Sequence, residues 1–127
     1  MKPYRTAIGH HIPMIMLSNA TYSAYDKVNA AGWSYAISTT LLRGGLGFKG
    51  VTITDSLTGT AKARGVSPSS LAFRAARAGT DMILLTGSEA STRGVYASLL
   101  TRVANGSLSR ATLQASYARI AAMKAGL

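Results

Sequence analysis

The segment Leu41–Thr58, LLRGGLGFKGVTITDSLT, decides the fold predicted for this chain. A helical stretch ends there at Gly44-Gly45, a β-branched strand follows over residues 51–54, and Asp55 stands directly after that strand. Glycine is typical of helix ends, and β-branched residues favour strands. Because α/β barrels place their catalytic groups at the C-terminal tips of parallel strands, Asp55 is the first candidate for a catalytic residue.

Two more apolar runs, residues 12–17 (IPMIML) and 81–86 (DMILLT), have the length of buried strands. Between and after the strands, the apolar spacing and the capping residues predict helices over residues 3–9, 34–43, 68–78, 91–103 and 110–125. Strands that alternate with helices indicate a parallel sheet with right-handed crossovers. The predicted fold class is therefore α/β.

The number of strands is small for that class. A (β/α)8 barrel has eight strands and typically ~250 residues, so this chain supplies about three of the eight βα units, followed by a C-terminal helix. No shift in composition marks a domain boundary. We therefore expect residues 1–127 to form a single unit, a partial TIM barrel.

Composition excludes several classes of protein. Apolar residues make up 47% of the 127 residues, which excludes a disordered chain. Fourteen Lys and Arg face four Asp and Glu, for a net charge of +10. Such an excess is compatible with a nucleic-acid partner, but the basic residues are dispersed, without runs or interleaved aromatics. We therefore expect no nucleic-acid partner.

Special sites and targeting segments are not expected either. The chain has no cysteine, which excludes disulfides and thiolate sites and leaves the compartment open. No metal-ligand cluster, phosphate loop or other cofactor motif is present, and Gly44-Gly45-x-Gly47 precedes a strand instead of following one. We expect no membrane span and no signal peptide within these residues. The full-length protein could be cytoplasmic or secreted.

A wider set of motifs resembles glycoside hydrolase family 3. Members have a strand of the form V-M-x-S-[HN]-x-x-Y and a loop with Asp. A helix ending L-L-R-x-x-L-G-F-x-G and the segment V-x-[IS]-T-D-x-L follow, and then A-x-A-G-x-D and R-I-x-x-x-K. The corresponding segments occur here in the same order over nearly the whole chain: Ile15–Tyr22, Asp26, Leu41–Gly50, Val51–Leu57, Arg77–Asp81 and Arg119–Lys124.

The resemblance implies a fold and an activity. These residues would be the sixth, seventh and eighth βα units of the family's catalytic barrel, and the chain is most similar to the bacterial β-N-acetylglucosaminidase branch. In that branch the Asp after the seventh strand, here Asp55, is the nucleophile of a retaining glycosidase. Its substrate would be a β-linked sugar, as in a β-N-acetylhexosaminidase or a β-glucosidase. The alternative for Asp55 is a structural residue that caps the next helix or turn.

The chain departs from the family pattern in one important respect. The upstream segment K-H-F-P-G-H-G and the loop with the Asp-x-His acid/base pair are absent, and His10-His11 precede the first strand, in the wrong place to substitute. A retaining glycosidase needs a general acid beside its nucleophile. We therefore expect this chain alone to be a fragment with little or no turnover.

We also expect particular roles for the other candidate residues. Asn19, at the tip of its strand, is a candidate hydrogen-bonding group for substrate, and Asp26 contacts either sugar hydroxyls or the neighbouring loop. Asp81, at the start of a strand, is expected to be structural, and Glu89 to stabilise the first turn of a helix. Trp33 either packs in the core or stacks on a sugar.

Two functions from other classes stay open. The chain could be a non-catalytic partial barrel that binds carbohydrate or associates with itself, since self-association would cover its open sheet edges. It could also be a basic nucleic-acid-binding module, which steep salt dependence would reveal.

Overall fold

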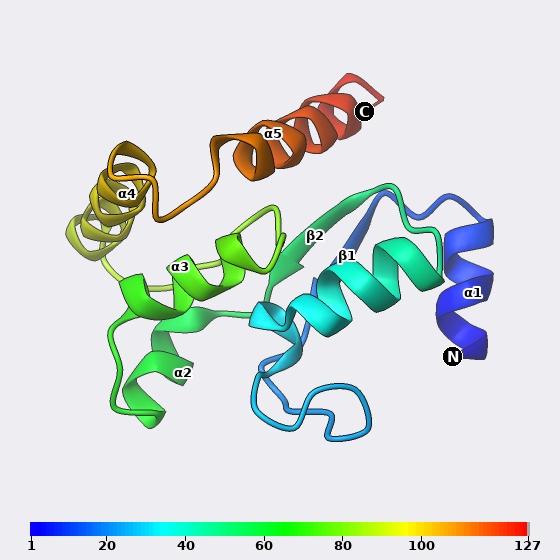
Figure 1. Ribbon diagram of the computed structural model, residues 1–127, viewed down its shortest axis with the longest axis horizontal. Helices are drawn as coiled ribbons and strands as arrows, with labels where there is room; N and C mark the ends of the chain where they lie inside the picture. The colour runs from blue at the N-terminus through cyan, green and yellow to red at the C-terminus, as the bar shows by residue number, and fades with distance from the viewer. Residues whose placement is uncertain (127) are drawn as a thin grey trace.

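The computed structural model describes residues 1–126, and its elements form an open, helix-rich α/β arrangement (Figure 1). Helices α1 and α4 lie at opposite ends of the long axis, with a small sheet between them. In chain order the elements are α1 (Lys2–Gly9), β1 (Met14–Leu17), the 3-10 helix η1 (Ala31–Trp33), the π-helix η2 (Ala36–Gly45), β2 (Val51–Thr54), α2 (Leu57–Ala63), α3 (Pro68–Arg77), α4 (Glu89–Ala104) and α5 (Arg110–Ala125).

The sheet has two parallel strands, β1 and β2, in the register Met14 to Val51 and Leu17 to Thr54. Ile15 and Leu17 are buried on one face, where they pack with apolar side chains of η1, η2 and the turn after η2. Met16 points to the other face and is 61% exposed. Parallel sheets normally have both faces covered, and here the face is open at Met16 but covered at Val51, which is 0% exposed.

The third strand predicted over residues 81–86 is not formed. Within this segment only Met82 makes a bridge, parallel to Ile53 of β2. The amide of Leu84 then donates to the hydroxyl of Thr54 instead of to a backbone carbonyl, at 3.0 Å. The segment pairs with β2 at Met82 but does not continue this pairing, because β2 ends at Thr54.

The helix predicted over residues 34–43 is also different. It begins two residues later, follows the 3-10 turn η1, and has π-type hydrogen bonds through Gly45. The bond from Leu46 N–H to the Leu41 carbonyl, at 2.8 Å, spans five residues instead of four. Glycine at positions 44 and 45 places no side chain in this widened turn, which is one reason that the sequence accommodates it.

The predicted starts of the later helices are confirmed at two serines. Ser67 accepts a hydrogen bond from Ser70 N–H and Ser109 accepts one from Thr112 N–H, so each caps its helix. Helix α4 starts two residues earlier than predicted, because Ser88 caps it through Ser91 N–H.

Among the described residues, five arginines lie over aromatic rings, which accounts for part of the basic excess. The Trp33 ring is 3% exposed and lies 5.2 Å from the Arg64 guanidinium and 5.9 Å from that of Arg74. The ring of Phe73 lies 3.9 Å from the Arg102 guanidinium. The core position of Trp33 is thereby confirmed, and guanidinium–ring contacts of this kind stabilise the packing of α3 against its neighbours.

Within the described residues, no helix is long and apolar enough to cross a membrane.

Gly50 permits the turn between η2 and β2, and we expect Gly50→Ala to destabilise the fold. An added Cβ would collide with the Pro13 carbonyl oxygen and lie 2.7 Å from Cζ of Phe48. Overpacking of this kind costs about 1–3 kcal/mol of unfolding free energy, measurable by urea denaturation. In the matched control Gly94→Ala, in α4, the added Cβ meets nothing within 4 Å. The control should be stabilised by roughly 0.5–1 kcal/mol, and equal losses in both variants would contradict the prediction.

Candidate active site

Polar residues gather where β1, β2 and the Met82 segment end. Because the strands are parallel, their C-terminal ends meet at one edge, and there the chain places Ser18-Asn19, Asp55-Ser56 and Thr86. Hydroxyl, amide and carboxylate groups at such an edge are suited to a polar substrate.

Asp55 is fixed through its backbone while its carboxylate is largely free. Its N–H donates to the Leu17 carbonyl at 3.0 Å, which ties it to the end of β1. Its Oδ1 accepts a hydrogen bond from Ser56 N–H at 2.6 Å, and within residues 1–126 the carboxylate accepts no other. The side chain is partly exposed. Ser56, and not Asp55, is the N-cap of α2, and the bond from Ser56 N–H is the contact of Asp55 with the following turn.

The turn after Asp55 is held from two sides. On the β1 side, Asn19 Nδ2 donates to the Ser56 carbonyl at 2.9 Å and to Thr60 Oγ1 at 2.7 Å. On the other side, the hydroxyls of Ser56 and Thr86 are 2.8 Å apart, and Thr86 N–H donates to Thr58 Oγ1. Sequence reasoning missed Thr86. The only signal for it was its position as the hydroxyl residue that ends the apolar run 81–86.

Asp26 organises its own loop. Its Oδ1 accepts from the backbone amides of Val28 and Asn29, both at 2.9 Å, and its Oδ2 accepts from the Ser34 hydroxyl at 2.7 Å. The backbone amide of Asn29, the Ser34 hydroxyl and the Val28 amide hold the pKa of Asp26 well below its ordinary value. Contact with the neighbouring loop, one of the two roles expected of Asp26, is therefore present. A contact with substrate stays a prediction, as it does for Asn19.

The two remaining acids lie in ion pairs. Asp81, whose side chain is 0% exposed, binds Arg43 and Arg119, each at 2.6 Å, at the opposite end of the sheet from Asp55. Glu89 pairs with Arg93 one turn later in α4, and both side chains are exposed. Both acids are therefore paired with arginines and not with Asp55. The described residues contain no group of three or more metal-ligating side chains.

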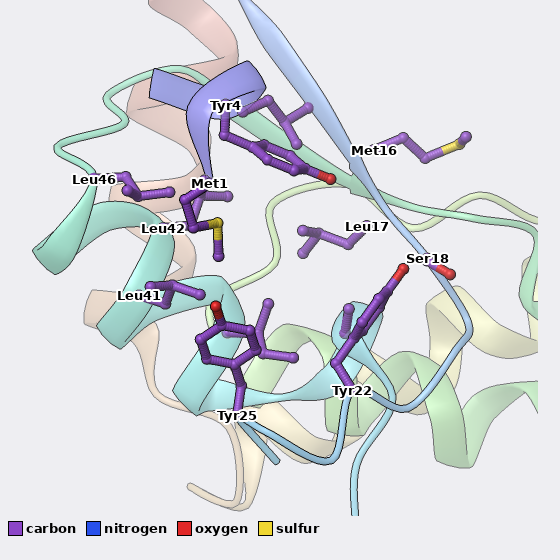
Figure 2. A pocket seen from close by; sticks show the side chains of 13 residues that line it. Met1, Tyr4, Met16, Leu17, Ser18, Tyr22, Tyr25, Leu41, Leu42 and Leu46 are labelled. Carbon is purple, nitrogen blue, oxygen red and sulfur yellow. The ribbon is translucent and has the colours of Figure 1, made fainter. Parts of the chain in front are cut away.

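An apolar hollow of about 140 Å³ lies along the free edge of β1 (Figure 2). Tyr4 reaches it from α1, while Tyr22 and Tyr25 reach it from the loop after β1. The rest of its lining is mostly Met, Leu and Ile from β1 and η2. Asp55 does not line the hollow, but Ser18, at the end of β1, lies at both the hollow and the polar edge.

Residues 1–123 match the sequence model of the glycosyl hydrolase family 3 N terminal domain. The chain belongs to glycosyl hydrolase family 3. The resemblance seen in the sequence motifs is thereby confirmed.

Named relatives agree with this family. A secreted glycosyl hydrolase, described as uncharacterized, from Arthroderma benhamiae is 36% identical over 127 residues, which cover 98% of this chain and 36% of the relative. A beta-hexosaminidase from Alkalilimnicola ehrlichii is 38% identical over 84 residues, 65% of this chain and 24% of the relative. The family 3 chain thus spans well under half the length of either relative.

A solved structure shows the same fold. The family 3 β-N-acetylglucosaminidase from a Paenibacillus species superposes with a TM-score of 0.87 at 30% identity, covering 96% of this chain and 23% of that one. The family 3 chain is therefore similar in backbone to a defined part of a much larger enzyme.

Proposed function

We propose that this chain is the part of a family 3 catalytic barrel that contains its sixth to eighth βα units, and that Asp55 is the nucleophile of a retaining glycosidase. The observation that supports it most is the position of Asp55 at the C-terminal end of β2. There its backbone is tied to β1 and one carboxylate oxygen is free of hydrogen bonds within residues 1–126. The proposed substrate is a β-linked N-acetylhexosaminide, because relatives of this chain are named β-N-acetylglucosaminidase and beta-hexosaminidase.

In the proposed reaction, a carboxylate oxygen of Asp55 attacks the anomeric carbon and the bond to the leaving oxygen breaks. A general acid must protonate that oxygen, and water must then hydrolyse the glycosyl ester. The carboxylates of Asp26 and Asp81 are already bonded within the chain, and Glu89 pairs with Arg93 on an exposed helix. The proposal therefore places the general acid outside this chain.

A test of the substrate uses sugars that need no general acid. Fluorinated N-acetylglucosaminyl fluoride, which has an activated leaving group, should label the chain covalently. The corresponding glucosyl fluoride should label it more slowly, and an ordinary β-N-acetylglucosaminide should be turned over little or not at all. Intact-protein mass spectrometry measures the two labelling rates, and release of the leaving group measures turnover. Binding of N-acetylglucosamine without any adduct would instead favour a non-catalytic carbohydrate-binding chain.

Self-association is the second candidate, favoured by the free edge of β1. The Pro13 carbonyl accepts from Val51 N–H of β2 and the Leu17 carbonyl from Asp55 N–H directly after β2. By alternation, the amide and carbonyl groups of Met14 and Met16 face away from β2. Unpaired strand edges are templates for pairing with another chain. A melting temperature that rises with protein concentration would support this candidate, and one independent of concentration would count against it.

A further inference from the structure

The amide of Asn19 is committed to the turn that follows Asp55. Its two N–H groups donate to two acceptors, the Ser56 carbonyl at 2.9 Å and Thr60 Oγ1 at 2.7 Å, across 37 and 41 residues of sequence. An amide nitrogen has only two hydrogens to donate. The nitrogen therefore has no hydrogen left for another partner.

The orientation of this amide follows from its partners. The Ser56 carbonyl can only accept, so the nitrogen and not the oxygen must face it. The oxygen, Oδ1, is consequently buried and has no hydrogen-bond partner among residues 1–126; it lies beside Gly32, where an added Cβ would be 3.6 Å away. A buried polar atom without a partner requires an explanation, and the two bonds made by the nitrogen provide one.

Ser56 connects Asn19 to the carboxylate of Asp55. The Ser56 N–H binds Asp55 Oδ1 at 2.6 Å, while the Ser56 carbonyl accepts from Asn19. The usual means of fixing a helix start is absent here, because the Ser56 side chain makes no cap hydrogen bond to α2 and instead meets the Thr86 hydroxyl. Asp55 N–H and Leu57 N–H are held by the Leu17 and Leu84 carbonyls, so within this turn it is the Ser56 carbonyl that the Asn19 amide holds.

We propose that Asn19 is a positioning residue for Asp55: it holds the Ser56 peptide so that the carboxylate keeps one attack geometry. The inference rests on the proposed role of Asp55. It differs from the substrate contact expected of Asn19 from sequence, because here Asn19 acts through Ser56 and touches no sugar. Small displacements of a reacting group reduce reaction rates strongly. Removing the Asn19 amide should therefore lower the rate at which Asp55 is labelled.

The test compares three variants of the full chain. Asn19→Asp has the same shape but no N–H to donate, and Asn19→His keeps one N–H at the same number of bonds from the backbone. Asn105→Asp is the matched control, since the exposed Asn105 only accepts a hydrogen bond, from Ser107 N–H, and aspartate accepts equally well. Two quantities are measured: amide hydrogen exchange in residues 55–58 without ligand, and the labelling rate with fluorinated N-acetylglucosaminyl fluoride.

Asn19→Asp should exchange faster at residues 55–58 and should be labelled roughly 10- to 100-fold more slowly. Asn19→His should fall between it and the parent, and Asn105→Asp should match the parent. Unchanged exchange at 55–58 in Asn19→Asp, or an unchanged labelling rate, would overturn the inference. A parent chain that no sugar labels would contradict the proposed function, while exchange at 55–58 would still decide whether Asn19 holds this turn.

Discussion

Replacing Asp55 by Asn is expected to abolish covalent labelling by fluorinated N-acetylglucosaminyl fluoride. Asparagine has nearly the same shape as aspartate, and its side-chain oxygen can still accept from Ser56 N–H at the position seen for Oδ1. The amide is not a nucleophile, so the loss should be on the order of 10³-fold or more, as for other nucleophile replacements. The measurement is the rate at which the mass of the intact chain increases.

An acid-to-amide control accompanies Asp55→Asn. Glu89→Gln removes an exposed carboxylate on α4. Glu89→Gln should be labelled at the parent rate. If Asp55→Asn were also labelled at that rate while its melting temperature stayed that of the parent, Asp55 would not be the nucleophile.

The largest effect on stability is expected from Asp81→Asn. The carboxylate of Asp81 binds Arg43 of η2 through Oδ2 and Arg119 of α5 through Oδ1, each at 2.6 Å, and Oδ2 also accepts from Thr52 N–H of β2 at 2.8 Å. One buried side chain therefore joins two helices and a strand. Without its charge, two largely buried guanidinium groups would face each other unpaired.

Removing one partner of such a buried ion pair costs about 3–5 kcal/mol. This is a large fraction of the 5–15 kcal/mol that is roughly typical of a domain, so Asp81→Asn should be largely unfolded under mild heating. Urea denaturation measures the difference. Glu89→Gln is the matched control, because its exposed pair with Arg93 should change the unfolding free energy by less than about 1 kcal/mol. Equal midpoints for the two variants would contradict this role of Asp81.

The Asp81 carboxylate also predicts how the stability of the fold decreases at low pH. Burial raises the pKa of Asp81, but hydrogen bonds from Arg119 and Thr52 and the charge of Arg43 outweigh it, and the net pKa lies below the ordinary value. The folded state thus binds fewer protons than the unfolded state. The stabilisation is therefore present above ~pH 4 and is lost as the pH falls through the lower folded pKa. Melting temperatures followed into acid should fall steeply in the parent and less steeply in Asp81→Asn.

The strand ends and helix starts could be predicted from sequence because their signals are local. β-branched residues before Asp55, Ser67 before Pro68 and Ser109 before the last helix each act within a few residues. The predicted strand over residues 81–86 failed because a ladder requires a partner strand, and β2 ends before the segment does. The apolar composition of residues 81–86 carries no information about where the partner strand ends.

The site could be predicted only in part, for a related reason. Asp81 was expected to be structural, but its two arginines lie 38 residues away on either side, and no local pattern links them. The bonds from Asn19 to Ser56 and Thr60 likewise cross about forty residues and depend on the parallel register of β1 and β2. Sequence motifs indicated which residues stand at the strand tips, whereas the hydrogen bonds among them required the fold.

Peptide mapping of the labelled chain tests the role of Asp55 most directly. Trypsin, which cleaves after Lys and Arg, releases residues 50–62, and Asp55 is the only acid in that peptide. Asp26 falls in the peptide of residues 6–27, and Asp81 and Glu89 fall together in residues 78–93. After treatment with fluorinated N-acetylglucosaminyl fluoride, we predict one sugar adduct, on residues 50–62 and on Asp55 within them. An adduct on either of the other peptides, or no adduct on any peptide, would contradict Asp55 as the nucleophile in this chain.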